Sequence, residues 1–308
     1  MKKILTILVL LSSTLGAVSA QQKTAASEYS TRYQMLVDKF GPTGLGIETV
    51  ILKWETDYPE DMDMLRAKFS YYLTKSISTE VVSRDSDRYL GQKPLMSLKD
   101  SLGNDVYYFQ ENIFDEELFS TAIQTVDKSI SLKPLDLSLR INKITALLSY
   151  EKEEPDLAAQ TLRSLVDYNG TSHPKWTYAD TAVDDEFFCG AVQEYCYSFF
   201  KTGSPTSFEA FLSISERMAS LYPKNPLYQD NIGSYYQVYK KDEKQALKYY
   251  GKALKLDPND YTAVKNCIII ARRQKNTKLE KKYLQTLVKI TPDETEKASA
   301  QIRLSSLK

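Results

Sequence analysis

The clearest apolar pattern lies in residues 225–292, where two successive stretches of 34 residues each carry two apolar stripes at helical spacing. The second stripe of the first stretch has members at offsets 0, 4, 7 and 8, namely Ala246, Tyr250, Ala253 and Leu254. Side chains at that spacing share one face of a helix. Each stretch ends at a proline, whose ring and missing N–H cannot continue a helix. The pattern therefore predicts two consecutive helix pairs.

Several residues of the first stretch also form a recognisable set. They are Asn231, Ile232, Gly233, Tyr236, Ala246, Tyr250, Ala253 and Pro258. This set resembles the signature of the tetratricopeptide repeat family, whose period is 34 residues. The second stretch keeps that length but differs at Cys267, Ile268 and Glu280, where the family prefers Leu, Gly and Ala. The resemblance implies stacked helix pairs whose first helices line a concave face for protein or peptide partners.

Prolines extend the repeat pattern toward the N-terminus. Pro59, Pro134 and Pro223 each close an apolar-striped segment, and Pro223 stands 35 residues before Pro258. The intervals between the upstream prolines exceed one period, so those repeats must contain insertions, which map to loops at one edge of a stack. We therefore predict an all-α fold, an α-solenoid of about six tetratricopeptide-like helix hairpins.

The predicted organisation has four parts. They are a signal peptide over 1–20, divergent helical repeats over 21–223 with insertions at about 77–115 and 170–183, two clear repeats over 224–292, and a capping helix over 293–308. The capping helix, with Ala298 and Ile302 as its expected apolar face, would cover the end of a stack that otherwise exposes its core.

The first insertion contains a strand signal. Leu95–Leu98 and Val106–Phe109 flank Gly103 and Asn104, a turn dipeptide that tolerates positive φ. These residues predict a small β-hairpin at about 95–110, which must lie against the helices because two strands alone are marginally stable. The preceding residues 77–93 are predicted to be a solvated loop.

The first twenty residues have the composition of a secretory signal. Lys2 and Lys3 precede the apolar segment Ile4–Leu11, and Val18–Ala20 supplies the small residues of a cleavage site. The apolar segment is too short to span a bilayer, and no cysteine follows it for lipid attachment. We expect a periplasmic or secreted protein with no integral membrane segment after signal removal, similar to exported tetratricopeptide proteins of Gram-negative bacteria.

The overall charge is balanced, with 40 basic and 40 acidic residues, which argues against nucleic acid as the partner. Its distribution is uneven, because residues 240–308 contain 17 basic and 8 acidic residues. Such asymmetry marks either a partner surface or the solvated outer faces of helices.

No catalytic, cofactor or metal motif stands out, so the chain is predicted not to be an enzyme. His173 is the only histidine and has no metal-ligand partners at suitable spacing. Asp184–Glu186 begin a predicted helix, where carboxylates cap free N–H groups more readily than they act as acid and base. Cys189 and Cys196 lie two helical turns apart, too far for a disulfide, so the three cysteines, with Cys267, are interpreted as buried apolar residues.

By the family resemblance, the partner-binding residues are polar positions on the first helices of the two clear repeats. The candidates are Asn231, Ser234, Gln237, Lys265, Asn266, Arg272 and Arg273, and Asp230 is expected to be exposed beside them. The favoured hypothesis is a non-enzymatic exported scaffold that binds a protein or peptide in the cell envelope. An alternative is a polysaccharide-binding or polysaccharide-processing protein, motivated by doublets among the 22 tyrosines and by the two insertions. A third hypothesis is self-association between the basic C-terminal repeats and the acidic remainder of another copy.

Overall fold

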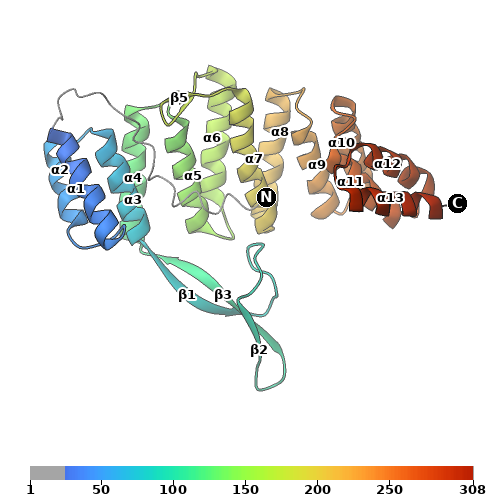
Figure 1. The fold of residues 1–308 in the computed structure, drawn as a ribbon, viewed down its shortest axis with the longest axis horizontal. Coiled ribbons are helices and arrows are strands. Elements are labelled where there is room, and N and C mark those ends of the chain that lie inside the picture. Colours follow the sequence, from blue (N-terminus) through green and yellow to red (C-terminus); the bar gives the residue numbers. More distant parts are fainter. Residues whose placement is uncertain (1–24, 308) are drawn as a thin grey trace. The chain divides into compact units, whose positions relative to one another are not determined.

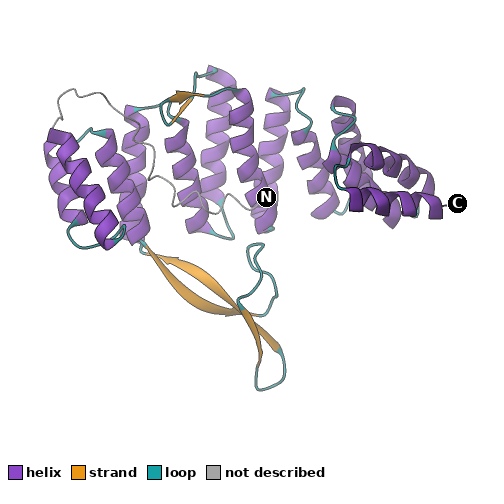
Figure 2. Ribbon diagram, viewed as in Figure 1, coloured by secondary structure: helices purple, strands orange, loops and turns teal. Residues whose placement is uncertain are grey.

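The computed structural model describes residues 25–307, so the predicted signal peptide lies outside the described residues. The described residues form two compact units, one of residues 25–76 with Glu116–Thr125 and the other of Ile77–Asp115 with residues 126–307. The described part contains thirteen helices in stacked pairs and a small antiparallel sheet (Figure 2). The predicted architecture of helix hairpins, a capping helix and a β-hairpin is confirmed.

The first unit holds three complete helices and the start of a fourth. They are α1 (Ala25–Phe40), α2 (Ile47–Asp57), α3 (Met62–Lys75) and α4 (Glu116–Leu132), the last of which continues into the second unit. Trp54 of α2 is buried and stacks on Tyr29 of α1, with the ring centroids 6.1 Å apart. Asp61 accepts a hydrogen bond from the Met64 N–H and so begins α3.

The second unit contains the helices in which the repeat pattern is clearest (Figure 1). They are α5 (Leu137–Glu151), α6 (Asp156–Ser172), α7 (Asp185–Thr202), α8 (Pro205–Leu221), α9 (Leu227–Val238), α10 (Glu243–Leu256), α11 (Tyr261–Arg273), α12 (Thr277–Ile290) and α13 (Glu294–Ser306). From α7 to α13, each helix packs on the next one along the chain, and α6 packs on α5 and α8. Asp184 accepts a hydrogen bond from the Phe187 N–H at the start of α7, as its capping role predicts.

The insertion after α3 forms a three-stranded antiparallel sheet in the order β1-β3-β2. The strands are β1 (Ile77–Arg84), β2 (Met96–Lys99) and β3 (Asp105–Phe114). Strands β2 and β3 are the hairpin that the turn dipeptide predicts. The expected loop over 77–93 is wrong for its first eight residues, each of which pairs with a residue of β3. These residues are mostly polar, so their pattern does not predict a strand. The strand is stabilised by its pairing with β3. In the second insertion, β4 (Thr177–Tyr178) and β5 (Thr181–Ala182) form a separate two-stranded sheet.

The last two helix pairs share one core, which Ala246, Tyr250 and Ala253 build from α10. The Tyr250 ring lies against Gly233 of α9, and a Cβ at that glycine would come within 2.6 Å of the ring. The missing side chain is therefore what lets the two helices approach closely.

The capping helix α13 packs with a different face from the expected one. Ala300 is buried, and Leu304 and Leu307 pack against the same core, whereas Ala298 and Ile302 are exposed. In this orientation Arg303 of α13 also reaches the carboxylate of Glu280.

Glu280 lies buried on α12 between two guanidinium groups. Its carboxylate accepts hydrogen bonds from Arg272 Nε at 2.7 Å and from Arg303 Nε and Nη2 at 2.9 and 3.1 Å. The hydrogen bond from Arg303, with that from Arg272, lowers the Glu280 pKa against the opposing effect of burial. The residue that departs from the family preference for alanine therefore joins α11, α12 and α13.

The tight contact at Gly233 predicts opposite effects for two glycine-to-alanine changes. Gly233→Ala should destabilise the protein by about 1–3 kcal/mol through overpacking against Tyr250. Gly251→Ala, on the neighbouring helix, meets no atom within 4 Å and should stabilise it by about 0.5–1 kcal/mol through helix propensity. Urea unfolding of the two variants measures both, and equal effects would contradict the packing argument.

The Glu280 contact predicts that Glu280→Ala loosens α13 and lowers stability by about 1–3 kcal/mol, because two hydrogen-bonded charges lose their partner. Glu294→Ala, which removes an exposed ion pair on the same helix, should change it by less than about 0.5 kcal/mol. Hydrogen exchange of the α13 amides gives the local readout.

The same contact has a defined pH dependence. The pKa of Glu280 is lower in the folded protein than in the unfolded chain. The ionised carboxylate therefore stabilises the fold fully at pH values above its unfolded-state pKa, and this contribution is lost as the pH falls through its folded-state pKa. The difference between wild type and Glu280→Ala should therefore shrink in acid. A difference that stays constant down to acid pH would show that the ion pairs do not dock the cap.

Candidate functional site

The candidate site is a stripe of half-exposed side chains on α11. Its members are Tyr261, Lys265, Ile269, Arg272 and Arg273, which recur every three or four residues and so share one face of the helix. Ile269 is 45% exposed although its neighbours Ile268 and Ile270 are buried. We call this set the α11 stripe. It presents one apolar side chain between cationic ones.

Each cationic side chain of the α11 stripe forms an ion pair with a carboxylate from another helix. Lys265 Nζ lies 2.8 Å from Glu296 of α13, and Arg273 Nε lies 2.7 Å from Glu243 of α10. Arg272 uses the buried Glu280 described above. The three cationic side chains nevertheless remain 42–48% exposed. The carboxylates hold them in place while leaving part of each charged group open to a partner.

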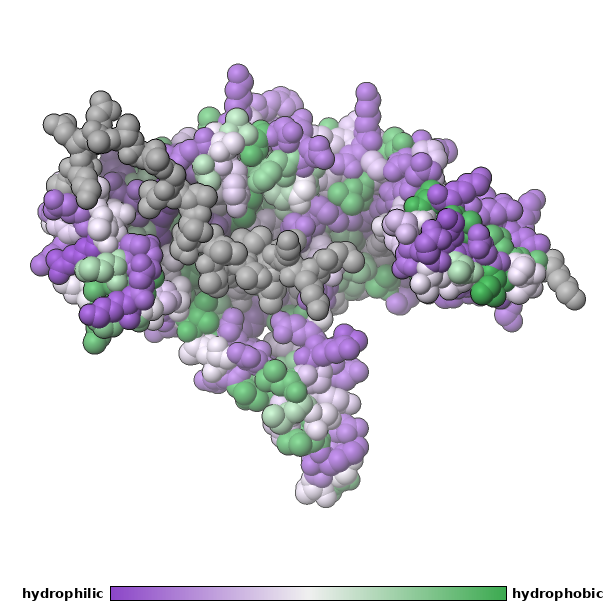
Figure 3. Space-filling model, in the orientation of Figure 1, coloured by the Kyte–Doolittle hydropathy of each residue, from purple (hydrophilic) through white to green (hydrophobic). Residues whose placement is uncertain are grey.

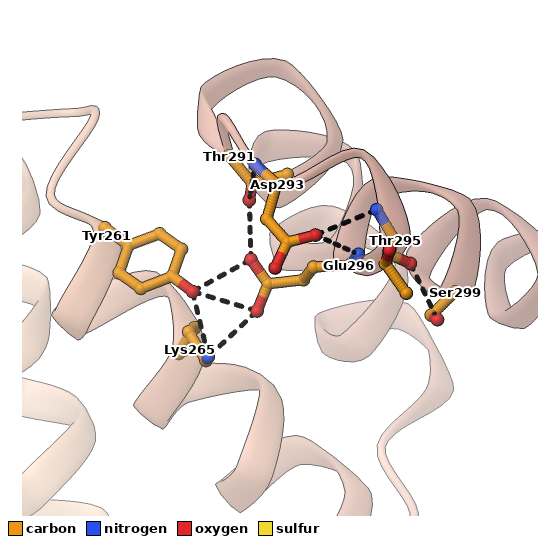
Figure 4. A network of polar contacts seen from close by, with 7 residues as sticks. All are labelled: Tyr261, Lys265, Thr291, Asp293, Thr295, Glu296 and Ser299. Atoms are coloured by element: carbon orange, nitrogen blue, oxygen red, sulfur yellow. Dashed lines mark hydrogen bonds and ion pairs between the residues drawn. The ribbon is translucent and has the colours of Figure 1, made fainter.

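The contact between Lys265 and α13 is part of a wider polar network (Figure 4). The Glu296 carboxylate accepts hydrogen bonds from the Tyr261 hydroxyl at 2.8 Å and from the Thr291 hydroxyl at 2.6 Å. Asp293 caps α13 by accepting from the Thr295 and Glu296 N–H groups. The hydrogen bond from Lys265, followed by that from Thr291, lowers the Glu296 pKa, and the carboxylate in turn raises the Lys265 pKa. Both groups therefore stay charged near neutral pH.

The polar side chains at the corresponding positions of α9 form hydrogen bonds within the repeat stack. Asn231 and Gln193 of α7 form a reciprocal amide pair with N···O distances of 2.7 and 3.2 Å. The Tyr250 hydroxyl donates to Gln237 at 2.6 Å and lies 3.2 Å from the Ser234 hydroxyl. Asn231 and Gln237 are buried, and Ser234 is half-buried, so the expected exposure of Asn231 and Gln237 is wrong. The polar groups reach inward because Tyr250 and Gln193 offer them partners.

Of the seven candidate residues, the structure places Lys265, Arg272 and Arg273 together on the α11 stripe. Asn266 is half-buried beside Lys265 on the same helix, whereas the three α9 residues are engaged inside the repeat stack. Sequence reasoning left Tyr261 and Ile269 out of the set. Their spacing from Lys265 by four residues in each direction was the available signal.

Asp230 of α9 is a buried carboxyl and was expected to be exposed. Burial raises its pKa to about 9, and a hydrogen bond with Asp260 together with the negative charges of Asp260 and Asp257 adds to the effect. Asp230 is therefore protonated near neutral pH. It joins α9 to the turn before α11 and takes no part in the exposed stripe.

The other carboxylate and tyrosine side chains considered as site residues make contacts within the protein. A pocket of about 310 Å³ between α6 and α8 contains Glu209, but this carboxylate already accepts hydrogen bonds from Tyr235 and Lys240. Tyr236 and Tyr249, each from a tyrosine doublet, stack on one another with centroids 5.5 Å apart. No cluster of His, Cys, Asp and Glu within residues 25–307 has the arrangement of a metal site.

Comparison with known proteins gives weak structural matches. No family model matches the sequence, and no curated protein matches it. The crystal structure of MamA matches over 62% of this chain and 92% of that chain, with 11% identity and a TM-score of 0.34. MamA 41-end from Desulfovibrio magneticus RS-1 matches over 78% of this chain and 99% of that chain, with 14% identity and a TM-score of 0.34. The helix pairing itself therefore defines this tetratricopeptide-like fold.

The buried Asp230 predicts that Asp230→Asn stabilises the protein. Because its folded-state pKa is raised from 3.8 to about 9, its contribution to stability is greatest in acid and falls as the pH rises between these values. Asparagine mimics the protonated carboxyl without that dependence, so the gain should reach about 1–3 kcal/mol at pH 8 and vanish near pH 4.

Urea unfolding across this pH range makes the comparison. Asp242→Asn is the matched control, because Asp242 caps α10 from an exposed position and asparagine caps equally well. If Asp230→Asn lowers stability at pH 8, the carboxyl is charged in the folded protein and the assignment is wrong.

Proposed function

We propose that this chain is a non-enzymatic scaffold that binds a protein or peptide partner through the α11 stripe. The observation that carries the proposal is the exposed Ile269, which stands between Lys265 and the two arginines on a helix whose other isoleucines are buried. Isolated exposed apolar residues are common, but one framed by fixed cations has the composition of a recognition surface.

The stripe favours a partner of a particular chemistry. An apolar side chain can cover Ile269, while carboxylates on either side of it can reach the exposed parts of Lys265 and Arg273. A short segment with one apolar anchor between acidic residues has this arrangement. The guanidinium groups add directionality because their N–H donors lie in a plane that suits carboxylates.

The cell envelope is the proposed location. It is supported by the composition of residues 1–20, which have the charge, apolar segment and small-residue end of a secretory signal. No helix among the described residues has the length and apolar character needed to cross a bilayer. In this proposal the scaffold acts after export.

Site-specific photocrosslinking in the native host tests the proposed surface. A p-benzoylphenylalanine residue at Ile269 should capture a defined partner, whereas the same residue at Lys282, on the exposed side of α12, should not. Introducing Arg273→Glu should reduce capture from position 269 by about tenfold or more, since it repels an acidic segment.

The matched control for charge is Lys278→Glu, which makes the same reversal outside the stripe and should leave capture unchanged. Equal capture from positions 269 and 282, or capture that survives Arg273→Glu, would show that the α11 stripe is not the partner-binding surface.

A further inference from the structure

The pocket between α6 and α8 is a groove between the second helices of two successive helix pairs. The two helices are in contact, and their side chains meet in register. Arg163 hydrogen-bonds to Ser213, and one turn further on Asp167 pairs with Arg217, so the partners stand fifty residues apart at both levels. The helices are therefore parallel, and each residue of this part of α6 lies level with a known residue of α8.

The groove combines a small volume with a polar lining. Its volume of about 310 Å³ is at the low end of the range for small-molecule sites. Exposed apolar side chains gather instead on the β1-β3-β2 sheet (Figure 3). A ligand of the groove must therefore be selected by charge and hydrogen bonding. We call this site the α6–α8 groove, and the residues that define it are Asp156, Ala159 and Arg163 of α6 and Glu209, Ala210 and Ser213 of α8.

Arg163 is half-buried in the groove and has no carboxylate partner among residues 25–307. Its side chain donates one hydrogen bond, from Nη1 to the Ser213 hydroxyl at 3.3 Å. Every other half-buried arginine of the described residues has a carboxylate or a backbone carbonyl as its acceptor. These pairs are Arg66 with Asp63, Arg84 with Glu111, Arg140 with the Pro134 carbonyl and Arg217 with Asp167. A guanidinium that is partly removed from water is stabilised by an anion, so Arg163 is suited to receive one from a ligand.

Two carboxylates line the part of the groove nearer the starts of the helices. The carboxylate of Asp156 is exposed and has no partner among the described residues. Glu209 is held through one oxygen only, because Tyr235 and Lys240 both donate to Oε1. The other oxygen of Glu209, Oε2, accepts no hydrogen bond from the described residues. Both acids can therefore accept hydrogen bonds from a ligand that carries an ammonium group.

The opposite charges are separated along the groove. Asp156 precedes Arg163 by seven residues, which is about 10 Å along the helix axis, and Glu209 lies about one turn, or 6 Å, before the level of Arg163. Ala159 and Ala210 lie between the two ends and are buried, so their methyl groups form an apolar floor. The groove therefore has an acidic end, a basic end and an apolar middle.

We propose that the α6–α8 groove binds a short zwitterion of the ω-amino acid class. The carboxylate of the ligand pairs with Arg163, whose planar donors match its two oxygens. The ammonium group, a compact donor of three hydrogen bonds, is shared between Asp156 and Oε2 of Glu209. The methylene chain that joins the two charged groups lies on the alanine floor, where it is removed from water.

A phosphate or another multiply charged anion fits the groove less well. Such a ligand would bring its charge close to Asp156 and Glu209, which repel it. The N–H groups at the helix starts, which otherwise attract anions, are already capped by Glu151 on α6 and by Ser204 on α8. The lining therefore favours a ligand that carries both charges over one that carries either alone.

Titration of the full chain with 6-aminohexanoate tests the proposal. This probe is about 7 Å long between its charged groups, from bond lengths of about 1.5 Å. With alanine methyls labelled for NMR, the Ala159 and Ala210 signals should shift and saturate with a Kd below about 1 mM. Arg163→Met should weaken binding by about tenfold or more, and Asp156→Asn by about threefold or more, because each removes one charged contact.

Both variants should fold normally, since Arg163 loses only the 3.3 Å contact with Ser213 and Asp156 is exposed. Circular dichroism checks this. The matched controls are Lys175→Met and Glu216→Gln, which remove one positive and one negative charge at exposed positions outside the groove and should leave binding unchanged.

Two probes with a single charge separate the zwitterion from simpler ligands. Hexanoate and hexylamine have the same chain length, and each should bind at least about tenfold more weakly than 6-aminohexanoate. Three outcomes would overturn the proposal: no saturable shift of the two alanine signals up to about 10 mM probe, binding that Arg163→Met leaves intact, or hexanoate that binds as tightly as 6-aminohexanoate. The groove shares no residue with the α11 stripe, so this titration and the photocrosslinking experiment can fail separately.

Discussion

The close approach of α9 and α10 at Gly233 is the contact on which the last two repeats depend. Without a Cβ at this position, the Tyr250 ring can lie against the α9 backbone and reach across the helix pair. Its hydroxyl then donates a hydrogen bond to Gln237 and lies within hydrogen-bonding distance of the Ser234 hydroxyl, both on α9. One small residue thus determines both the spacing of the helices and the burial of polar groups that would otherwise face a partner.

The consequences reach the neighbouring helix. With Asn231 and Gln237 of α9 engaged internally, the exposed candidate side chains of the last two repeats lie on α11. Glu280 of α12 contacts one of them and also contacts α13. This carboxylate holds Arg272 on α11 and Arg303 on α13, so the orientation of the cap and the position of a stripe cation have a common cause. A buried charge is costly unless it is paired, and here both partners of Glu280 are supplied by adjacent helices.

The helix pairs could be predicted from sequence because apolar spacing and proline positions are local properties. The polar contacts could not, because Asn231 depends on Gln193 and Asp230 on Asp260, residues that a helical period does not bring together. Strand β1 escaped prediction for a similar reason, since its hydrogen bonds go to residues about thirty positions away. The face of α13 was misassigned because Ile302 is the most apolar residue of that helix, whereas Ala300, Leu304 and Leu307 pack against the core and Arg303 reaches Glu280.

The three cysteines have a chemical consequence for the proposed location in the cell envelope. All three are free and buried, and burial raises the pKa of Cys196 to about 12 and that of Cys267 to about 11. Thiolate is the species that attacks disulfides and electrophiles, so these sulfurs are almost inert while the repeats stay closed. In an oxidising compartment the chain therefore keeps its thiols by shielding them, and any opening of the stack is reported by the onset of their alkylation.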